Sequence, residues 1–287
     1  MWLRRLWFGD HGKLRTPWRL VLFFVVAFVA TRVAGGLIYP VVLTAGRWMG
    51  MRLILFGWVG VVGLLIAHEV SLRRIDKLPW SAAGLGRSAA RPALLLQGTL
   101  LGAIAIAIPS LVLWSLGLLQ AESQPAGSSV LEGARALVLL APLAFMEELT
   151  LRGYVLTVLR EVVDWRIAVA LTSIVFGALH VGNPGSTPGA LTMTVLAGVM
   201  LGTIVVVTNS LYAATAAHLA WNWVMAAVLH VPVSGFGVST PDYRLVDAGP
   251  DWLTGGAWGP EGGMAAALGM GGVLVYLYAR RARPREG

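Results

Sequence analysis

The sequence contains no cysteine and few charged residues. Its 287 residues include no cysteine at all, so disulfides, thiol nucleophiles, iron–sulfur clusters and cysteine-ligated zinc are excluded. Only 13% of the residues are charged and 57% are hydrophobic, whereas an average soluble domain carries about 25% charged residues. Water is therefore not the only solvent of this chain. There is also no internal repeat, so an inverted-repeat transporter gains no support.

Long apolar runs are abundant. Eight of them are long enough to cross about 30 Å of hydrocarbon as helices. They lie near residues 18–39, 53–70, 92–118, 134–158, 166–181, 189–208, 211–230 and 263–280. We therefore predict an all-α fold, a polytopic integral membrane helical bundle of about eight transmembrane helices. We expect residues 1–287 to form a single membrane domain.

The net charge of +8 has a pattern that indicates membrane topology. Most of the lysines and arginines lie before the first run, in residues 71–91, in residues 152–166, and after residue 279. This bias predicts a multi-pass protein of the plasma (inner) membrane with both termini in the cytoplasm. The cations form short clusters rather than a stripe with interleaved aromatic residues. The bilayer is therefore the expected partner, and nucleic acid is not.

Two segments lie outside the apolar runs and differ in composition. Residues 1–17 are basic and contain tryptophan, so we expect a cytoplasmic interfacial prefix. Residues 231–262 are rich in glycine and proline and are expected to form an extracytoplasmic loop. A solvated loop is favoured over a lid. The acidic residues of this loop are Asp242, Asp247, Asp251 and Glu261.

The fourth apolar run contains three ionisable residues, Glu147, Glu148 and Arg152. Each charge costs about 2.5–3.5 kcal/mol at the centre of a membrane helix, so these side chains should face protein or water. At 100° per residue, Glu148 and Arg152 share a helix face and form a structural ion pair, whereas Glu147 points elsewhere. An unpaired carboxylate in such a place suits a general base. A buried ion network for packing, or a charged helix end at the interface, are the alternatives.

Two later runs add histidines. His180 ends the fifth run, and the seventh contains His218 and Asn222, which are four residues apart and share one face. Each histidine alone is more typical of a buried hydrogen-bonding group. Together with Glu147, however, these residues match what amide hydrolysis requires. Glu147 assisted by His180 would activate water, and His218 with Asn222 would stabilise the oxyanion.

Three motifs now stand in order on successive expected helices: Glu147-Glu148-x-x-x-Arg152, Phe176-x-x-x-His180 and His218-x-x-x-Asn222. This set resembles the CPBP family of intramembrane proteases, also called the CAAX protease and bacteriocin-processing or abortive-infection family. That family includes the Ras-converting CAAX endopeptidase. The resemblance covers roughly residues 134–225, which are then the catalytic core helices.

The resemblance implies a hydrolase that performs intramembrane proteolysis on a membrane-associated or lipid-modified peptide or protein. Glu147, His180, His218 and Asn222 would be its catalytic residues. The family is commonly labelled metalloprotease, although a metal-free glutamate mechanism has also been argued. A divalent metal such as zinc is therefore a possible cofactor, with Glu147, His180 and His218 as ligands. No His-Glu-x-x-His helix supports a metal, so metal-independent chemistry is slightly favoured.

Two functions from other classes are alternatives. One is a non-catalytic membrane scaffold or immunity protein that uses the polar cluster for packing, and the other is a proton-coupled transporter. Outside the motifs, we expect His68 and Glu69 in an interfacial charge cluster. Gly98-x-x-x-Gly102 and Gly198-x-x-x-Gly202 have the spacing of close helix crossings.

Overall fold

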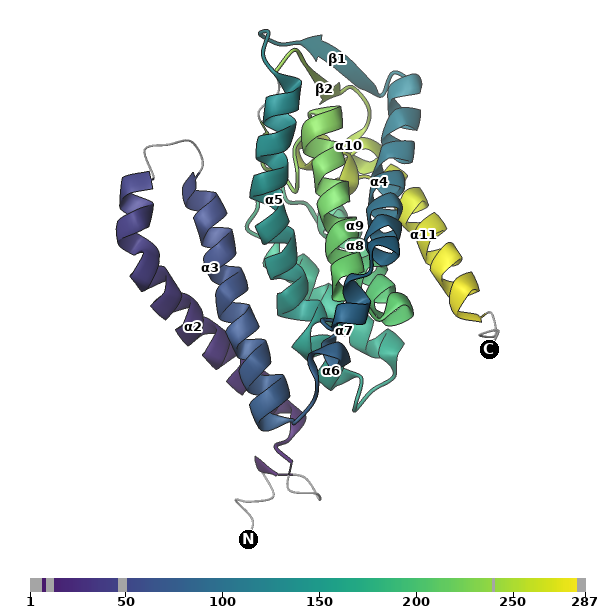
Figure 1. Ribbon diagram of the computed structural model, residues 1–287. Helices are drawn as coiled ribbons and strands as arrows, with labels where there is room; N and C mark the ends of the chain where they lie inside the picture. Colours follow the sequence, from purple (N-terminus) through teal and green to yellow (C-terminus); the bar gives the residue numbers. More distant parts are fainter. Residues whose placement is uncertain (1–6, 9–12, 46–50, 239–240, 283–287) are drawn as a thin grey trace.

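The computed structural model describes residues 7–8, 13–45, 51–238 and 241–282. Much of the expected prefix, residues 1–6 and 9–12, lies outside this range. The long helices are α2 (Thr16–Ala45), α3 (Met51–His68), α4 (Pro92–Ser115), α5 (Ser129–Arg152), α7 (Trp165–Leu179), α8 (Pro188–Thr208), α9 (Leu211–Trp223) and α11 (Met264–Ala282). Short helices α6 (Tyr154–Leu159) and α10 (Asp251–Thr254) and strands β1 (Leu119–Ser123) and β2 (Tyr243–Asp247) complete the fold (Figure 1). The predicted all-α class is confirmed.

Each of the eight apolar runs coincides with one of these long helices. Two continue as π-helical turns, α3 through Glu69–Ile75 and α9 through Val224–Leu229. Within the described residues, five helical segments are long and apolar enough to cross a membrane: Thr16–Val41, Ile54–Ile75, Pro92–Ser115, Ser129–Leu159 and Pro188–Thr208. The chain is therefore a multi-pass membrane protein. Spans at α7, α9 and α11 remain predictions.

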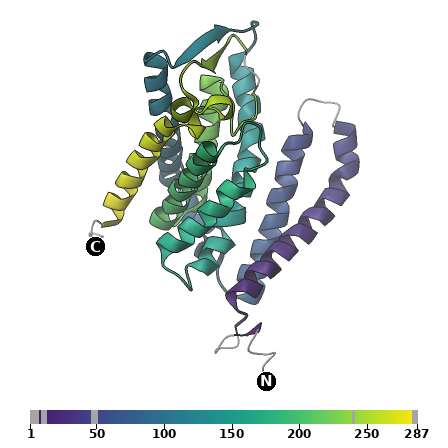
Figure 2. The same cartoon turned by 180° about the vertical axis from the view of Figure 1, so that it is seen from behind.

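Helix α2 shows which surface faces lipid. It lies at the edge of the molecule, paired with α3 (Figures 1 and 2). Its outer side exposes a row of large apolar residues that includes Phe28 (65% exposed) and Leu37 (77% exposed). This face is apolar apart from the exposed Arg32, whose guanidinium lies 5.9 Å from the centre of the Phe28 ring. Such a face is unfavourable in water and compatible with acyl chains, which are as apolar as leucine.

Helix α9 lies at the centre of the bundle because small residues let its neighbours approach closely. A Cβ at Gly98 would lie 2.0 Å from the carbonyl oxygen of Ala213, and one at Gly102 would lie 1.9 Å from that of Ala217. Only glycine permits this contact between α4 and α9. The expected close crossing at Gly98-x-x-x-Gly102 is confirmed, and it fixes the helix that carries His218.

The second glycine motif holds α7 against α8. A Cβ at Gly198 would approach Ser173 to 2.9 Å, and one at Gly202 would approach Val169 to 3.0 Å. This crossing positions the end of α7, and hence His180, beside the central helix. The predicted close crossing at Gly198-x-x-x-Gly202 is therefore also confirmed.

The break between α5 and α6 is stabilised by a residue whose place was predicted wrongly. His68 is fully buried rather than interfacial, and its Nε2 accepts a hydrogen bond of 3.0 Å from the backbone N–H of Tyr154. This satisfies a donor at the new helix start, which no intrahelical carbonyl reaches. A Cβ at Gly153 would lie 2.1 Å from His68 Nε2, so glycine is required there. Glu69, by contrast, does pair with Arg74 at 3.7 Å on the surface.

A buried charged network ties the N-terminal hairpin to α6. Arg19 contacts Asp76 at 2.5 Å and Glu161 at 2.7 Å, and the hydroxyl of Tyr154 donates to Asp76 at 2.7 Å. The hydrogen bond from Arg19 holds the pKa of Glu161 below its ordinary value, against the opposing effect of partial burial. The network orients α2 relative to the core.

Strands β1 and β2 form an antiparallel ribbon at one end of the bundle, with Ala121 opposite Leu245. The ribbon joins the connection between α4 and α5 to the loop 231–262 at the same end of the bundle (Figure 1). Nearby, Asp242 accepts hydrogen bonds from the Ser129 hydroxyl and the Gly127 N–H, which lower its pKa.

The loop 231–262, for which a solvated loop was favoured, is partly buried. Val231, Val233 and Trp258 are 2%, 8% and 1% exposed, whereas Phe236 and Trp252 are 56% and 68% exposed. The buried residues pack against the bundle, and two side chains of the loop line a cavity beside α9.

Candidate active site

The ion pair predicted from helix spacing is present. Arg152 Nη1 lies 3.3 Å from Glu148 Oε1, one turn apart on α5, and both side chains are completely buried. Arg152 also donates to the carbonyl oxygen of Gly198 at 3.4 Å, and its guanidinium lies 4.2 Å from the centre of the Phe176 ring. These three contacts, with Glu148, the Gly198 carbonyl and the Phe176 ring, hold the guanidinium of Arg152 among α5, α7 and α8.

His218 lies between the two glutamates, which sequence spacing did not predict. Its Nδ1 is 3.1 Å from Glu148 Oε1, and its Nε2 is 3.8 Å from Glu147 Oε2. Because Glu148 is paired with Arg152 and accepts only, Nδ1 carries the shared proton. The Nε2 atom is then the one that faces Glu147.

Glu147 points away from the Glu148–Arg152 pair, as the helical angle predicts. Its side chain is 34% exposed, yet its Oε2 atom is buried and has no hydrogen-bond partner within the described part of the chain. Buried carboxylate oxygens usually accept a hydrogen bond. Oε2 of Glu147 is therefore an acceptor that no other described residue engages through a hydrogen bond.

His180 terminates α7 with one ring nitrogen fixed. Its Nδ1 lies 2.7 Å from the carbonyl oxygen of Phe176, and a carbonyl can only accept, so Nδ1–H is the donor. This leaves Nε2 as an acceptor when the ring is neutral. The Phe176 ring packs edge-on against both His180 and His218, with centroids 4.7 and 5.9 Å apart, so the Phe-x-x-x-His motif places both histidines.

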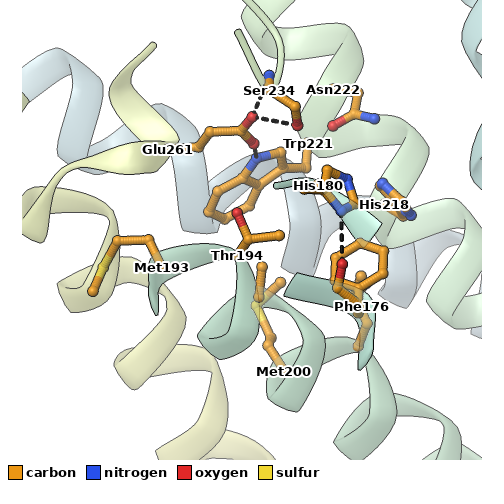
Figure 3. A pocket seen from close by; sticks show the side chains of 12 residues that line it. Phe176, His180, Met193, Thr194, Met200, His218, Trp221, Asn222, Ser234 and Glu261 are labelled. Carbon is orange, nitrogen blue, oxygen red and sulfur yellow. Dashed lines mark hydrogen bonds between the residues drawn. The ribbon is translucent and has the colours of Figure 1, made fainter. Parts of the chain in front are cut away.

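A cavity of about 30 Å³ lies beside both histidines (Figure 3). By this measure a cavity needs about 10–15 Å³ to hold one water molecule, so there is room for water. His180, His218 and Asn222 all line it, together with residues of α8, α9 and the loop; Glu147 is not among the residues that line it. Of the predicted catalytic residues, three therefore share the cavity, and Glu147 contacts one of them, His218.

The sequence analysis did not predict the other polar residues that line the cavity. Trp221, Ser234 and Glu261 also line the cavity, and the last two come from the loop 231–262. Glu261 was noted only as one of several acidic loop residues. No periodicity connects it to the motifs, because its position depends on how the loop folds back over α9.

A second cavity, of about 490 Å³, adjoins the first, since Met193 of α8 lines both. Its wall combines loop glycines with the large side chains of Trp252 and Met264 and the carboxylate of Asp251. Trp252 is 68% exposed and Met264 is 49% exposed. The second cavity therefore opens at the surface, where a larger molecule has access.

The described residues do not form the metal site that was considered. Among them, no three His, Asp or Glu side chains are grouped closely enough to hold a metal ion. The set Glu147, His180 and His218 thus does not fit a ligand shell as it stands, and no step below uses a metal.

Comparison with known proteins supports the family resemblance. Residues 129–224 match the family model described as type II CAAX prenyl endopeptidase Rce1-like. This segment begins with α5 and ends just after α9, so it contains all three motifs and both histidines. Over this segment the predicted resemblance to the CAAX protease family is confirmed. Comparison with curated proteins and with solved structures gives no significant match.

Proposed function

We propose that this protein is an intramembrane endopeptidase that hydrolyses a peptide bond of a membrane-associated, lipid-modified substrate. The observation that carries the proposal is the convergence of His180, His218 and Asn222 on one cavity, with Glu147 3.8 Å from His218. These groups come from three helices within a bundle that faces lipid. The family model that matches the same segment is one of CAAX prenyl endopeptidases.

In the proposed reaction, water is the nucleophile. Glu147 accepts a proton from water through Oε2, which has no hydrogen-bond partner among the described residues, while the water oxygen attacks the scissile carbonyl carbon. His180 assists by accepting a hydrogen bond from the same water at Nε2. The carbonyl π electrons move to oxygen and form a tetrahedral oxyanion. Its collapse breaks the C–N bond, and Glu147 returns the proton to the leaving amine.

His218 and Asn222 would stabilise the oxyanion. The Asn222 amide is a donor that needs no change of protonation. His218 becomes a second donor when Nε2 also carries a proton. Glu148 and Arg152 hold the ring in place through Nδ1, which preorganises the donor at little cost during the reaction.

The adjoining cavity supports a peptide substrate. The first cavity holds little more than the reacting water, so residues flanking the scissile bond need other space. The second cavity offers about 490 Å³ and shares Met193 with the first. We place the flanking residues there.

For orientation, we propose the plasma membrane with both termini in the cytoplasm, from the distribution of cations. The ribbon and the loop 231–262 would then face the opposite side. Because the chain has no cysteine, a single Cys replacing Ser123 of β1 gives an unambiguous reading. This cysteine should react with an impermeant maleimide only when the reagent is added outside. Labelling only from the cytoplasmic side would show that the orientation is the opposite of the one proposed.

The experiment that tests the function compares the wild-type chain with Glu147→Gln in lipid vesicles. A quenched fluorogenic peptide with an S-farnesyl cysteine in a CAAX sequence is the reporter. We expect cleavage by the wild type and none by Glu147→Gln, with equal unfolding temperatures, because the amide keeps the size of the side chain but not its basicity. Full turnover by Glu147→Gln would refute the assignment. Membrane proteomics of cells with either form should reveal the native substrate as an accumulating precursor.

A further inference from the structure

Glu261 connects the loop 231–262 to the central helix. It lies in the short 3-10 turn Pro260–Gly262, beyond the segment that matches the family model. Its carboxylate accepts three hydrogen bonds: from Trp221 Nε1 at 2.6 Å, from the Ser234 N–H at 2.6 Å, and from the Ser234 hydroxyl at 2.9 Å (Figure 3). A single carboxylate thus joins two parts of the loop to α9.

The backbone around Ser234 is held in an unusual conformation by this contact. Ser234 has φ +48°, the left-handed region that residues other than glycine rarely adopt, and Gly235 follows with φ +83°. The carbonyl of Ser234 also accepts a hydrogen bond of 3.0 Å from the Asn183 side chain. A strained non-glycine residue persists only where its surroundings over-determine it, and such strain concentrates at functional sites.

The contact also lies at the reacting groups. Trp221, Ser234 and Glu261 line the same cavity as His218 and Asn222. Trp221 directly precedes Asn222 in α9 and follows His218 by three residues, so its indole is fixed on the helix that would hold the oxyanion. Any shift of this indole moves the cavity wall beside both proposed donors.

The chemistry of Glu261 indicates positioning rather than proton transfer. All three of these hydrogen bonds come from donors, and they occupy both carboxylate oxygens. A group whose oxygens are engaged in this way is poorly suited to exchange protons with substrate. It is well suited to fix the two segments that it joins.

We propose that Glu261 and Ser234 form a latch, in which Glu261 is a positioning residue that fixes Trp221 and closes the cavity on its loop side. This inference rests on the proposed peptidase function and adds to it a residue from outside the matched family segment. The loop then does more than cover the bundle, because it completes the wall against which water and the scissile bond are held.

The first test measures cleavage of the farnesylated reporter peptide by the full chain in lipid vesicles. We expect Glu261→Gln to lower kcat by on the order of 10- to 100-fold, the range for a small misplacement of reacting groups, with KM changed less. Trp221→Phe removes the indole donor to the same carboxylate. The double variant should therefore be no slower than the slower single variant, because the two act through one contact.

The matched control is Glu122→Gln. Glu122 pairs with Arg244 on the exposed ribbon at the same end of the bundle, so its loss should leave kcat unchanged. The proposal would be overturned if kcat were unchanged in Glu261→Gln. It would also be overturned if the fold-decrease in kcat of the double variant equalled the product of the fold-decreases of the two single variants. A mere fall in unfolding temperature would not produce this kcat pattern.

The second test does not depend on activity. Thr194 lines the cavity and is 8% exposed, so a single Cys replacing it reports access. With the latch intact, an impermeant maleimide should label this position slowly, and Glu261→Gln should accelerate labelling by roughly tenfold or more. Equal rates would overturn the latch. Faster labelling in a protein that cleaves no reporter would instead support the latch and count against the peptidase.

Discussion

Removing Arg152 should destabilise the protein. Removing the charge of its partner Glu148 as well should restore part of the lost stability. In Arg152→Met, the completely buried Glu148 loses the cation 3.3 Å away and keeps only His218 at 3.1 Å. Breaking a buried pair at one partner typically costs about 3–5 kcal/mol. A charge at the centre of a membrane helix costs about 2.5–3.5 kcal/mol. Loss of the Phe176 contact adds about 0.5–2 kcal/mol.

We therefore expect the free energy of unfolding to fall by roughly 3.5–7 kcal/mol in Arg152→Met, which combines the broken pair with the lost Phe176 contact. Glu148→Gln should also destabilise, since it leaves Arg152 without its counter-ion. The double variant Glu148→Gln/Arg152→Met contains no unpaired charge, so it should recover about 2 kcal/mol or more relative to Arg152→Met. Cleavage should be lost in all three variants, because none retains the Glu148–Arg152 pair that holds His218 in place.

The assay is unfolding of each purified variant in mixed micelles by titration with a denaturing detergent, with helical content as the signal. The wild type and the three variants form a double-mutant cycle, whose coupling free energy isolates the pair. A coupling near zero, or an Arg152→Met protein as stable as wild type, would refute the reasoning. The side chains would then not form a buried ion pair.

Two further predictions concern packing and pH. Gly102→Ala should destabilise the chain by about 1–3 kcal/mol, because its Cβ would meet the Ala217 carbonyl at 1.9 Å; the control Gly271→Ala, whose Cβ meets nothing within 4 Å, should be neutral or slightly stabilising in the same titration. The Arg19 hydrogen bond lowers the pKa of Glu161 in the folded protein. The resulting stabilisation is complete above the pKa of glutamate in the unfolded chain, about 4.3. It is lost as the pH falls through the lower pKa of the folded state. Glu161→Gln should therefore lose less stability than wild type between pH 5 and 3, and identical acid-side curves would contradict this contribution.

The helices were predictable because the bilayer imposes a simple rule on sequence. A segment of about 20 apolar residues has few alternatives to a helix, and each of the eight runs became one. The Glu148–Arg152 contact followed from spacing alone, because residues four apart meet on a helix surface. The glycine crossings followed from local spacing in the same way.

The contacts that were missed join segments distant in sequence. His68 reaches the N–H of Tyr154 across 86 positions, and His218 reaches Glu148 across 70. Neither spacing nor hydropathy encodes such pairs. The same holds for Glu261, whose partners depend on the fold of a loop rich in glycine and proline, where no periodic pattern constrains the path.

The most direct test of the account is a single-turnover cleavage of the farnesylated reporter in H₂¹⁸O, followed by mass spectrometry of the product and of the peptide containing Glu147. Direct attack by water activated at Glu147 predicts one ¹⁸O atom in the new product carboxylate and none in Glu147. An unlabelled product with ¹⁸O in the glutamate would show that the carboxylate itself attacks the substrate. That result would contradict the general-base role on which the proposed chemistry depends.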